Sequence, residues 1–134
     1  MRWLLGAAYV AAGLLHLSSP EPFLTITPGW VPFPEEVIRF TGVAELAGAL
    51  GLLIPRTRRA AGVGLALYAL CVWPANIKHM LDGPDIAALD NDLYYHVPRM
   101  VLQPVLIWWA LFCSGVTNWP FTRRPSTPPG AGPR

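Results

Sequence analysis

Four apolar segments, each close to the length that crosses a lipid bilayer, constrain this chain more than any other feature. They span residues 3–17, 36–54, 59–78 and 93–116. A transmembrane helix needs about 20 residues, with about 17 as the lower limit, so only the first segment is marginal. Charged residues make up 13% of the 134 residues, whereas soluble domains carry about 25%. The pattern predicts an all-α protein, an integral membrane four-helix bundle over residues 1–117.

The first segment has a second interpretation. Arg2 followed by a short apolar stretch is also typical of a signal peptide. Because no clear small-x-small cleavage site precedes the polar turn Ser18-Ser19-Pro20, we expect the segment to be retained as a helix.

The connections between the segments differ in character. Residues 18–36 hold five prolines together with three aromatic residues, so they are too broken for a spanning helix and too apolar for an ordinary exposed loop. We expect this stretch to lie in the membrane interface or to dip back against the bundle. Residues 80–92 form an acidic loop, in which a short helix could start at Pro84. Residues 118–134 are rich in proline, and we expect a disordered cytoplasmic tail.

Charge divides the connections into two classes. If the N-terminus is cytoplasmic, then Arg2, the turn PRTRR at 55–59 and the arginines of the tail are all cytoplasmic, and the connections that hold acidic residues all lie outside. Short cytoplasmic loops carry the excess of Lys and Arg in membrane proteins. We therefore predict that both termini are cytoplasmic. The basic turn is explained by topology and by anionic lipid, so we expect no nucleic-acid partner.

Glycines on two of the segments are candidates for close helix packing. Small residues let membrane helices approach each other, where packing and hydrogen bonds replace the hydrophobic driving force. The candidates are Gly42, Gly48 and Gly51 on the second segment and Gly62 and Gly64 on the third.

Polar residues within the segments gather toward the outer side. At about 1.5 Å of rise per residue, Glu45 and Gln103 fall near mid-membrane. None of the polar residues within the segments falls in the inner half of the membrane. Four helices would therefore contribute to one polar zone that opens outward. The candidates for ligand binding or proton relay are Glu45, Arg99, Gln103, His16, Asn76, His96 and His79. No catalytic residue is identified among them.

Glu45 needs a partner, because an unpaired carboxylate in hydrocarbon is costly. Arg99 is the simplest partner, since a guanidinium can bind a carboxylate through two hydrogen bonds. Arg99 also shares one face of its helix with His96 and Gln103. We predict a Glu45–Arg99 pair supported by Gln103, with His16 as a further contact. The network could serve a ligand or protons, or it could only hold the helices together.

Metal and thiol chemistry have weak support. Cys71 and Cys113 lie inside apolar runs without CxxC or zinc spacing, so we expect both to be buried packing residues. Histidines at these depths could be interface residues, metal or haem ligands, or proton carriers. No two of them lie i, i+4 on one helix. The sequence identifies no cofactor; a quinone is kept as a candidate, ahead of haem or a metal.

Several short runs resemble the DoxX-like family of small four-helix membrane proteins. They are FTGVAEL at 40–46, GLLIP at 51–55, WPANI at 73–77 and RMVLQ at 99–103, in an order and spacing similar to that family over residues 1–115. The resemblance implies a multi-pass protein of the bacterial inner membrane. Family members include subunits of quinone-linked sulfur oxidation, components of thiol-stress complexes, and assembly chaperones of membrane proteins.

Two functions from different classes remain open. The first is a redox-associated membrane subunit that binds a small ligand or a quinone headgroup in an outer polar pocket, beside a membrane or redox protein partner. The second is a non-enzymatic scaffold or assembly chaperone whose polar network is structural. Transport ranks last, because four helices leave little room for a pathway without a homo-oligomer. The sequence carries no recognisable nucleotide or flavin site, and it leaves open whether the chain is an enzyme.

Overall fold

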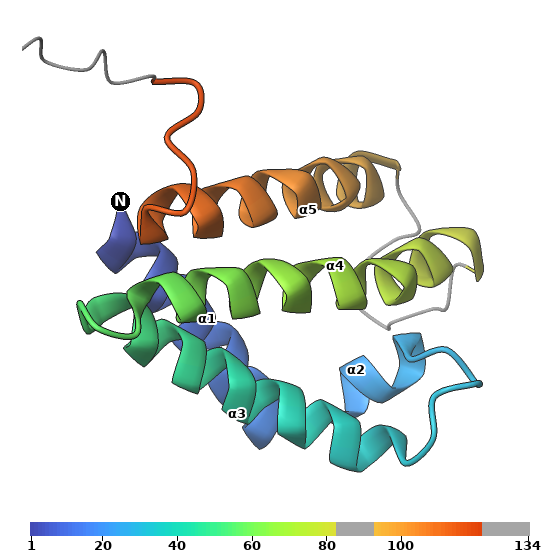
Figure 1. Ribbon diagram of the computed structural model, residues 1–134. Coiled ribbons are helices and arrows are strands. Elements are labelled where there is room, and N and C mark those ends of the chain that lie inside the picture. The colour runs from blue at the N-terminus through green and yellow to red at the C-terminus, as the bar shows by residue number, and fades with distance from the viewer. Residues whose placement is uncertain (83–92, 122–134) are drawn as a thin grey trace, which may run out of the picture.

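The computed structural model describes residues 1–82 and 93–121, and this part of the chain is all-helical (Figure 1). The described ranges contain five α-helices and no strand. The helices are α1 Arg2–Ser18, α2 Glu21–Ile26, α3 Pro34–Leu53, α4 Arg58–Asp82 and α5 Leu93–Ser114. Four of them cover the apolar segments, and α2 is a helix that the sequence did not predict. Most of the acidic loop at 80–92 and of the tail at 118–134 lies outside the described residues.

The start of α3 follows from its first residues. Pro34 occupies the first turn, where a proline needs no N–H partner, and Phe33 before it has left-handed backbone with φ of 48°. Glu35 and Glu36 lie in the first turn, where the helix dipole favours negative charge. Arg39 donates a 2.6 Å hydrogen bond to Glu35 one turn earlier. The proline-rich stretch thus ends in a sharp corner rather than continuing as a loop.

The helices pack mainly in two pairs. α1 packs against α3, and α4 packs against α5. Figure 1 shows the N-terminus, the α3–α4 turn and the end of α5 at one end of the molecule. We call this the basic end, because it carries Arg2, Arg56, Arg58 and Arg59. The opposite end, which holds α2 and the start of α3, is called the α2 end.

The core is closely packed toward the basic end. Leu5 of α1 and Leu52 of α3 have no exposed surface. Gly62 of α4 lies so close to α5 that an added Cβ would overlap the Ser114 side chain and lie 2.9 Å from the Ala110 carbonyl oxygen. The other buried members of this cluster are Tyr9, Ala49, Leu65, Ala66 and Ala110.

Four of the five glycines selected from the sequence make the close contacts expected of them. An added Cβ would crowd a neighbouring helix or the following turn at Gly42, Gly48, Gly51 and Gly62, but it would meet open space at Gly64. Of the two cysteines, Cys113 is half-buried and Cys71 is exposed. The prediction that Cys71 is buried is therefore wrong, because an apolar helix here also turns apolar side chains outward.

Within the described residues, two stretches are long and apolar enough to cross a membrane, judged by length and composition. They are Arg58–Lys78 in α4 and Val97–Ser114 in α5. Only 22% and 17% of these windows are buried inside the molecule. The two most apolar helices therefore present most of their side chains to the surroundings.

Candidate functional site

A cavity of about 360 Å³ lies among the helices and reaches the α2 end. All five helices and the α2–α3 connection contribute to its lining. Apolar side chains form most of the wall, and a few polar groups converge on it. Pockets for small molecules are typically 300–1,000 Å³, mostly apolar, with a small number of placed polar groups. The cavity has the size and character of a ligand site.

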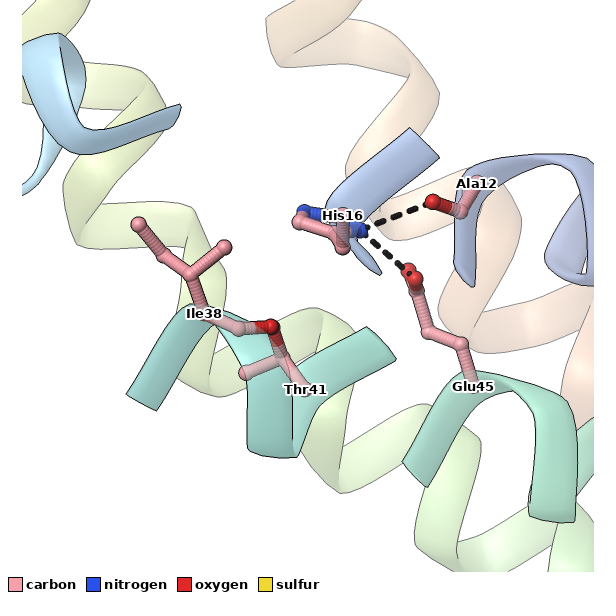
Figure 2. A network of polar contacts seen from close by, with 5 residues as sticks. All are labelled: Ala12, His16, Ile38, Thr41 and Glu45. Carbon is pink, nitrogen blue, oxygen red and sulfur yellow. Dashed lines mark hydrogen bonds and ion pairs between the residues drawn. The ribbon is translucent and has the colours of Figure 1, made fainter. Parts of the chain in front are cut away.

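The centre of the site is a pair between α1 and α3, seen in Figure 2. His16 Nδ1 lies 2.8 Å from Glu45 Oε2 and 3.0 Å from the carbonyl oxygen of Ala12. The Glu45 side chain is only 4% exposed and that of His16 14%. A backbone carbonyl can only accept a hydrogen bond, so Nδ1 carries a proton and donates it. The buried carboxylate is therefore held by the imidazole.

Two glycines explain why His16 reaches Glu45. An added Cβ on Gly13 would lie 2.7 Å from the Gly42 carbonyl oxygen, and one on Gly42 would lie 3.0 Å from His16 Cβ. The backbones of α1 and α3 therefore approach each other closely one turn before these polar residues. This contact corrects the predicted partners: Glu45 is paired with His16, the residue predicted as a further contact, rather than directly with Arg99.

The fourth and fifth helices supply a second polar pair. Arg99 of α5 donates a 2.7 Å hydrogen bond to the Asn76 side chain of α4. Gln103 is buried, and its amide donates to the Ala69 carbonyl oxygen at 3.4 Å. All three side chains line the cavity that His16 and Glu45 also line.

Of the seven site residues predicted from the sequence, five thus meet at one cavity. They are Glu45, Arg99, Gln103, His16 and Asn76. The other two, His79 and His96, belong to α4 and α5, but their side chains lie outside the described part of the chain. The structure therefore brings every candidate whose side chain is described to one cavity, and a role in ligand binding or proton relay stays a prediction.

Tyr9 is a site residue that the sequence analysis missed. It lines the cavity, it is 5% exposed, and its hydroxyl has no hydrogen-bond partner among the described residues. Its ring packs edge-on against Tyr68 at 6.5 Å between centroids, and Tyr68 in turn interacts with Glu45. The available signal was its spacing: Tyr9 lies seven residues before His16, on the same face of α1.

Aromatic residues from the α2 end cover the site. The Phe23 ring of α2 lies over the His16 ring at 3.9 Å between centroids. Trp30 lines the cavity as well but is 75% exposed. The stretch of 18–36 therefore folds back against the helices, as one of its two predicted arrangements required.

No cluster of three or more His, Cys, Asp or Glu side chains that could hold a metal occurs within residues 1–82 and 93–121 as described. The chemistry of the cavity is instead that of hydrogen bonding in apolar surroundings. Hydroxyl, imidazole, guanidinium and amide groups there can bind and orient the oxygen atoms of a small molecule or exchange protons with them.

The chain matches, over residues 5–114, a family described as a domain of unknown function (DUF8561), and it belongs to that family. No curated protein and no solved structure matches it. The matched range contains all of the lining residues of the cavity. The site is therefore part of the family's domain, and its function has to be argued from the chemistry of the cavity.

Proposed function

Starting from membership in a family without a known function, we propose that this chain is a multi-pass membrane protein that binds a small ligand with a quinone-like headgroup. In this proposal α1, α3, α4 and α5 span the bilayer as a four-helix bundle. The cavity opens to the non-cytoplasmic side, and α2 with its flanking aromatic residues lies at the outer interface. The observation that carries the ligand is the buried Tyr9 hydroxyl, which lacks a protein partner at the wall of an apolar cavity.

The distribution of polarity supports a lipid environment. Leu50, Leu67 and Val101 are 61%, 57% and 59% exposed, whereas the charged residue Glu45 is 3% exposed. Soluble proteins rarely expose large continuous apolar surfaces, and exposed large apolar residues occur along all four long helices here. The low burial of the apolar windows in α4 and α5 argues in the same direction. A bilayer would cover these surfaces without any partner.

The orientation is supported by the charges at the two ends. Arginines gather at the basic end, and Glu21, Glu35 and Glu36 lie at the α2 end. Positive charge in short loops marks the cytoplasmic side. α4, with 25 residues, would measure about 37 Å, longer than the roughly 30 Å of hydrocarbon. α1 has 17 residues, the shortest of the four, and lies at the lower limit for a span.

A quinone-like headgroup fits the chemistry of the wall. Its ring is flat and apolar, and its carbonyl oxygens accept hydrogen bonds. The Tyr9 hydroxyl and the Arg99 guanidinium are donors at the wall of the same cavity. The resemblance of the sequence to the DoxX-like family adds a proposed setting, the bacterial inner membrane beside a redox partner.

The test is to look for a bound molecule in the full chain extracted gently from membranes. We expect a native mass spectrum to show added mass, and a solvent extract to show the absorbance of a quinone. Ala12 lines the cavity and Ala11 is exposed on the same helix, so Ala12→Leu should remove the molecule and Ala11→Leu should retain it. An added mass that survives Ala12→Leu would place the ligand elsewhere.

A scaffold or assembly chaperone is the second candidate, and one observation favours it. Three polar contacts of the site are satisfied within the protein: His16 with Glu45, Arg99 with Asn76, and Gln103 with a backbone carbonyl. Such contacts can serve only to hold helices together. Capture of a stable membrane partner, with no added mass in the native spectrum and no effect of Ala12→Leu, would favour this candidate.

A further inference from the structure

We propose that the ligand is held at two polar points on one face of α1, the Tyr9 hydroxyl and Nε2 of His16, and that Glu45 is a positioning residue for His16. The inference rests on the proposed function and deepens it, because it names the ligand contacts and the shape of the ligand that they fit.

The deep point is Tyr9. A buried hydroxyl without a partner costs free energy, and most buried polar groups in native proteins are paired. Tyr9 is only 5% exposed, and no described residue forms a hydrogen bond with its hydroxyl. Since this side chain lines the cavity, an oxygen atom of a bound molecule can supply the missing hydrogen bond.

The outer point is His16. Glu45 and the Ala12 carbonyl both take their hydrogen bonds from Nδ1. Figure 2 shows the second ring nitrogen on the side of the ring away from Glu45. Within the described residues, this Nε2 makes no hydrogen bond with the protein. A carboxylate that accepts a hydrogen bond from Nδ1 fixes the orientation of the ring. In its imidazolium form the ring carries a proton on Nε2 as well, and Nε2 can then donate a hydrogen bond to an oxygen atom of a ligand.

The spacing of the two points defines a class of ligand. Tyr9 and His16 are seven residues apart, about two turns and roughly 10 Å along the axis of α1. Their side chains reach into one cavity, and between them Ala12 contributes only a methyl group to its lining. A flat apolar ring with oxygen atoms on opposite edges, as in a para-quinone, can lie along this face and meet both groups.

The experiment compares two probes on the full chain in detergent. Decylbenzoquinone carries the two oxygen atoms, and decylbenzene lacks them but has the same tail. We expect the quinone to bind about tenfold or more tightly than decylbenzene. Tyr9→Phe and His16→Asn should each weaken quinone binding by roughly five- to tenfold and leave decylbenzene binding unchanged. Ser114→Ala, a buried hydroxyl removed outside the cavity, should change neither affinity.

The positioning role of Glu45 has its own readouts. Glu45→Gln should weaken quinone binding in the natural protein but have no additional effect in the His16→Asn background. In protein labelled with ¹⁵N-histidine, the Nε2 signal that disappears in His16→Asn should shift when decylbenzoquinone is added. Glu45→Gln should shift the Nδ1 signal of the same ring. Two additive losses of affinity in the double variant would contradict a role that acts through His16.

The possible results distinguish ligand binding itself from the contacts at Tyr9 and His16. If neither probe binds, the proposed function and this inference fail together. If the quinone binds equally well to the natural protein, Tyr9→Phe and His16→Asn, the two-point contact is wrong while ligand binding stands. If a variant fails to fold, the histidine spectrum of the natural protein decides, and an Nε2 signal that does not respond to the quinone overturns the inference.

Discussion

The packing of the long helices differs between the two ends of the molecule: it is close at the basic end and open toward the α2 end. At the basic end, Gly62 and Ser114 bring α4 and α5 together until no space for a methyl group remains. Toward the α2 end, the helices enclose a cavity of about 360 Å³ whose wall mixes small apolar residues with a few polar ones. The closeness of the helices, rather than helix content, therefore differs between the ends, and only the α2 end has room for a ligand.

A similar contrast exists within the cavity itself. The α1–α3 contact at Gly13 and Gly42 is as close as contacts at the basic end, yet it lies directly beside the polar pair. One close contact therefore stabilises the fold, and the other also sets the geometry of the site. Substitutions at the two contacts should therefore differ in how strongly they affect stability and ligand binding.

Gly62→Ala should give the largest loss of stability. The new Cβ would overlap the Ser114 side chain and press on the backbone of α5, which cannot move aside as a flexible side chain would. We expect a loss of about 3 kcal/mol, the upper range for overpacking. The measurement is thermal unfolding in detergent, with Gly64→Ala as the matched control, since a Cβ there meets open space. Equal losses of stability from both substitutions would contradict the close α4–α5 contact at the basic end.

Gly13→Ala should have a smaller effect on stability and a larger one on the site. The Cβ would lie 2.7 Å from the Gly42 carbonyl oxygen, so α1 and α3 must separate. We expect a loss of about 2 kcal/mol together with weaker binding of decylbenzoquinone. In contrast, the protein fraction that still folds in Gly62→Ala should bind the quinone normally. Loss of binding in both variants would show that the two ends are not independent.

Glu45→Gln should cost about 1 kcal/mol. The side chain keeps its shape, and its amide oxygen can still accept the hydrogen bond from His16 Nδ1, but an amide is a weaker acceptor than a carboxylate. Unfolding by heat at constant pH gives the difference. A loss as large as that of Gly62→Ala would mean that the pair is the main support of the fold, which would favour the scaffold candidate.

Tyr9→Phe should leave stability nearly unchanged in the absence of ligand. The substitution removes a hydroxyl that has no partner within the described protein and retains the ring that packs against Tyr68. Deleting an unsatisfied polar group is neutral or slightly stabilising. The unfolding midpoint of the variant should therefore match that of the natural protein, while saturating decylbenzoquinone raises it less. A clear loss of stability without ligand would indicate that the hydroxyl has a structural partner.

Much of the fold could be read from the sequence because its signals are long and repeated. The four apolar segments correspond to α1, α3, α4 and α5 within a few residues at most ends. The helix α2 was missed, since its six residues, which include Pro22, are too few to show a helical period. Its packing depends on a tertiary contact, the Phe23 ring over His16, which local sequence does not report.

The site was predictable in its membership and less so in its contacts. Depth along each helix was enough to group Glu45, Arg99 and Gln103, because polar side chains avoid an apolar surrounding wherever they can share an interior. The partner of Glu45 depended on which helices approach most closely, and the Gly13–Gly42 contact decides that. Tyr9 was missed because a tyrosine in an apolar run is usually a packing residue. Only the structure shows that its hydroxyl lacks a hydrogen-bond partner.

The most direct test of the account is an experimental structure of the full chain in a lipid environment with decylbenzoquinone added. We expect density for a flat ring inside the cavity, with one oxygen near the Tyr9 hydroxyl and the other near His16 Nε2, while Nδ1 remains hydrogen-bonded to Glu45. A cavity that stays free of the probe at saturating concentration, or density for the ring on the outer surface of α4 or α5, would contradict it.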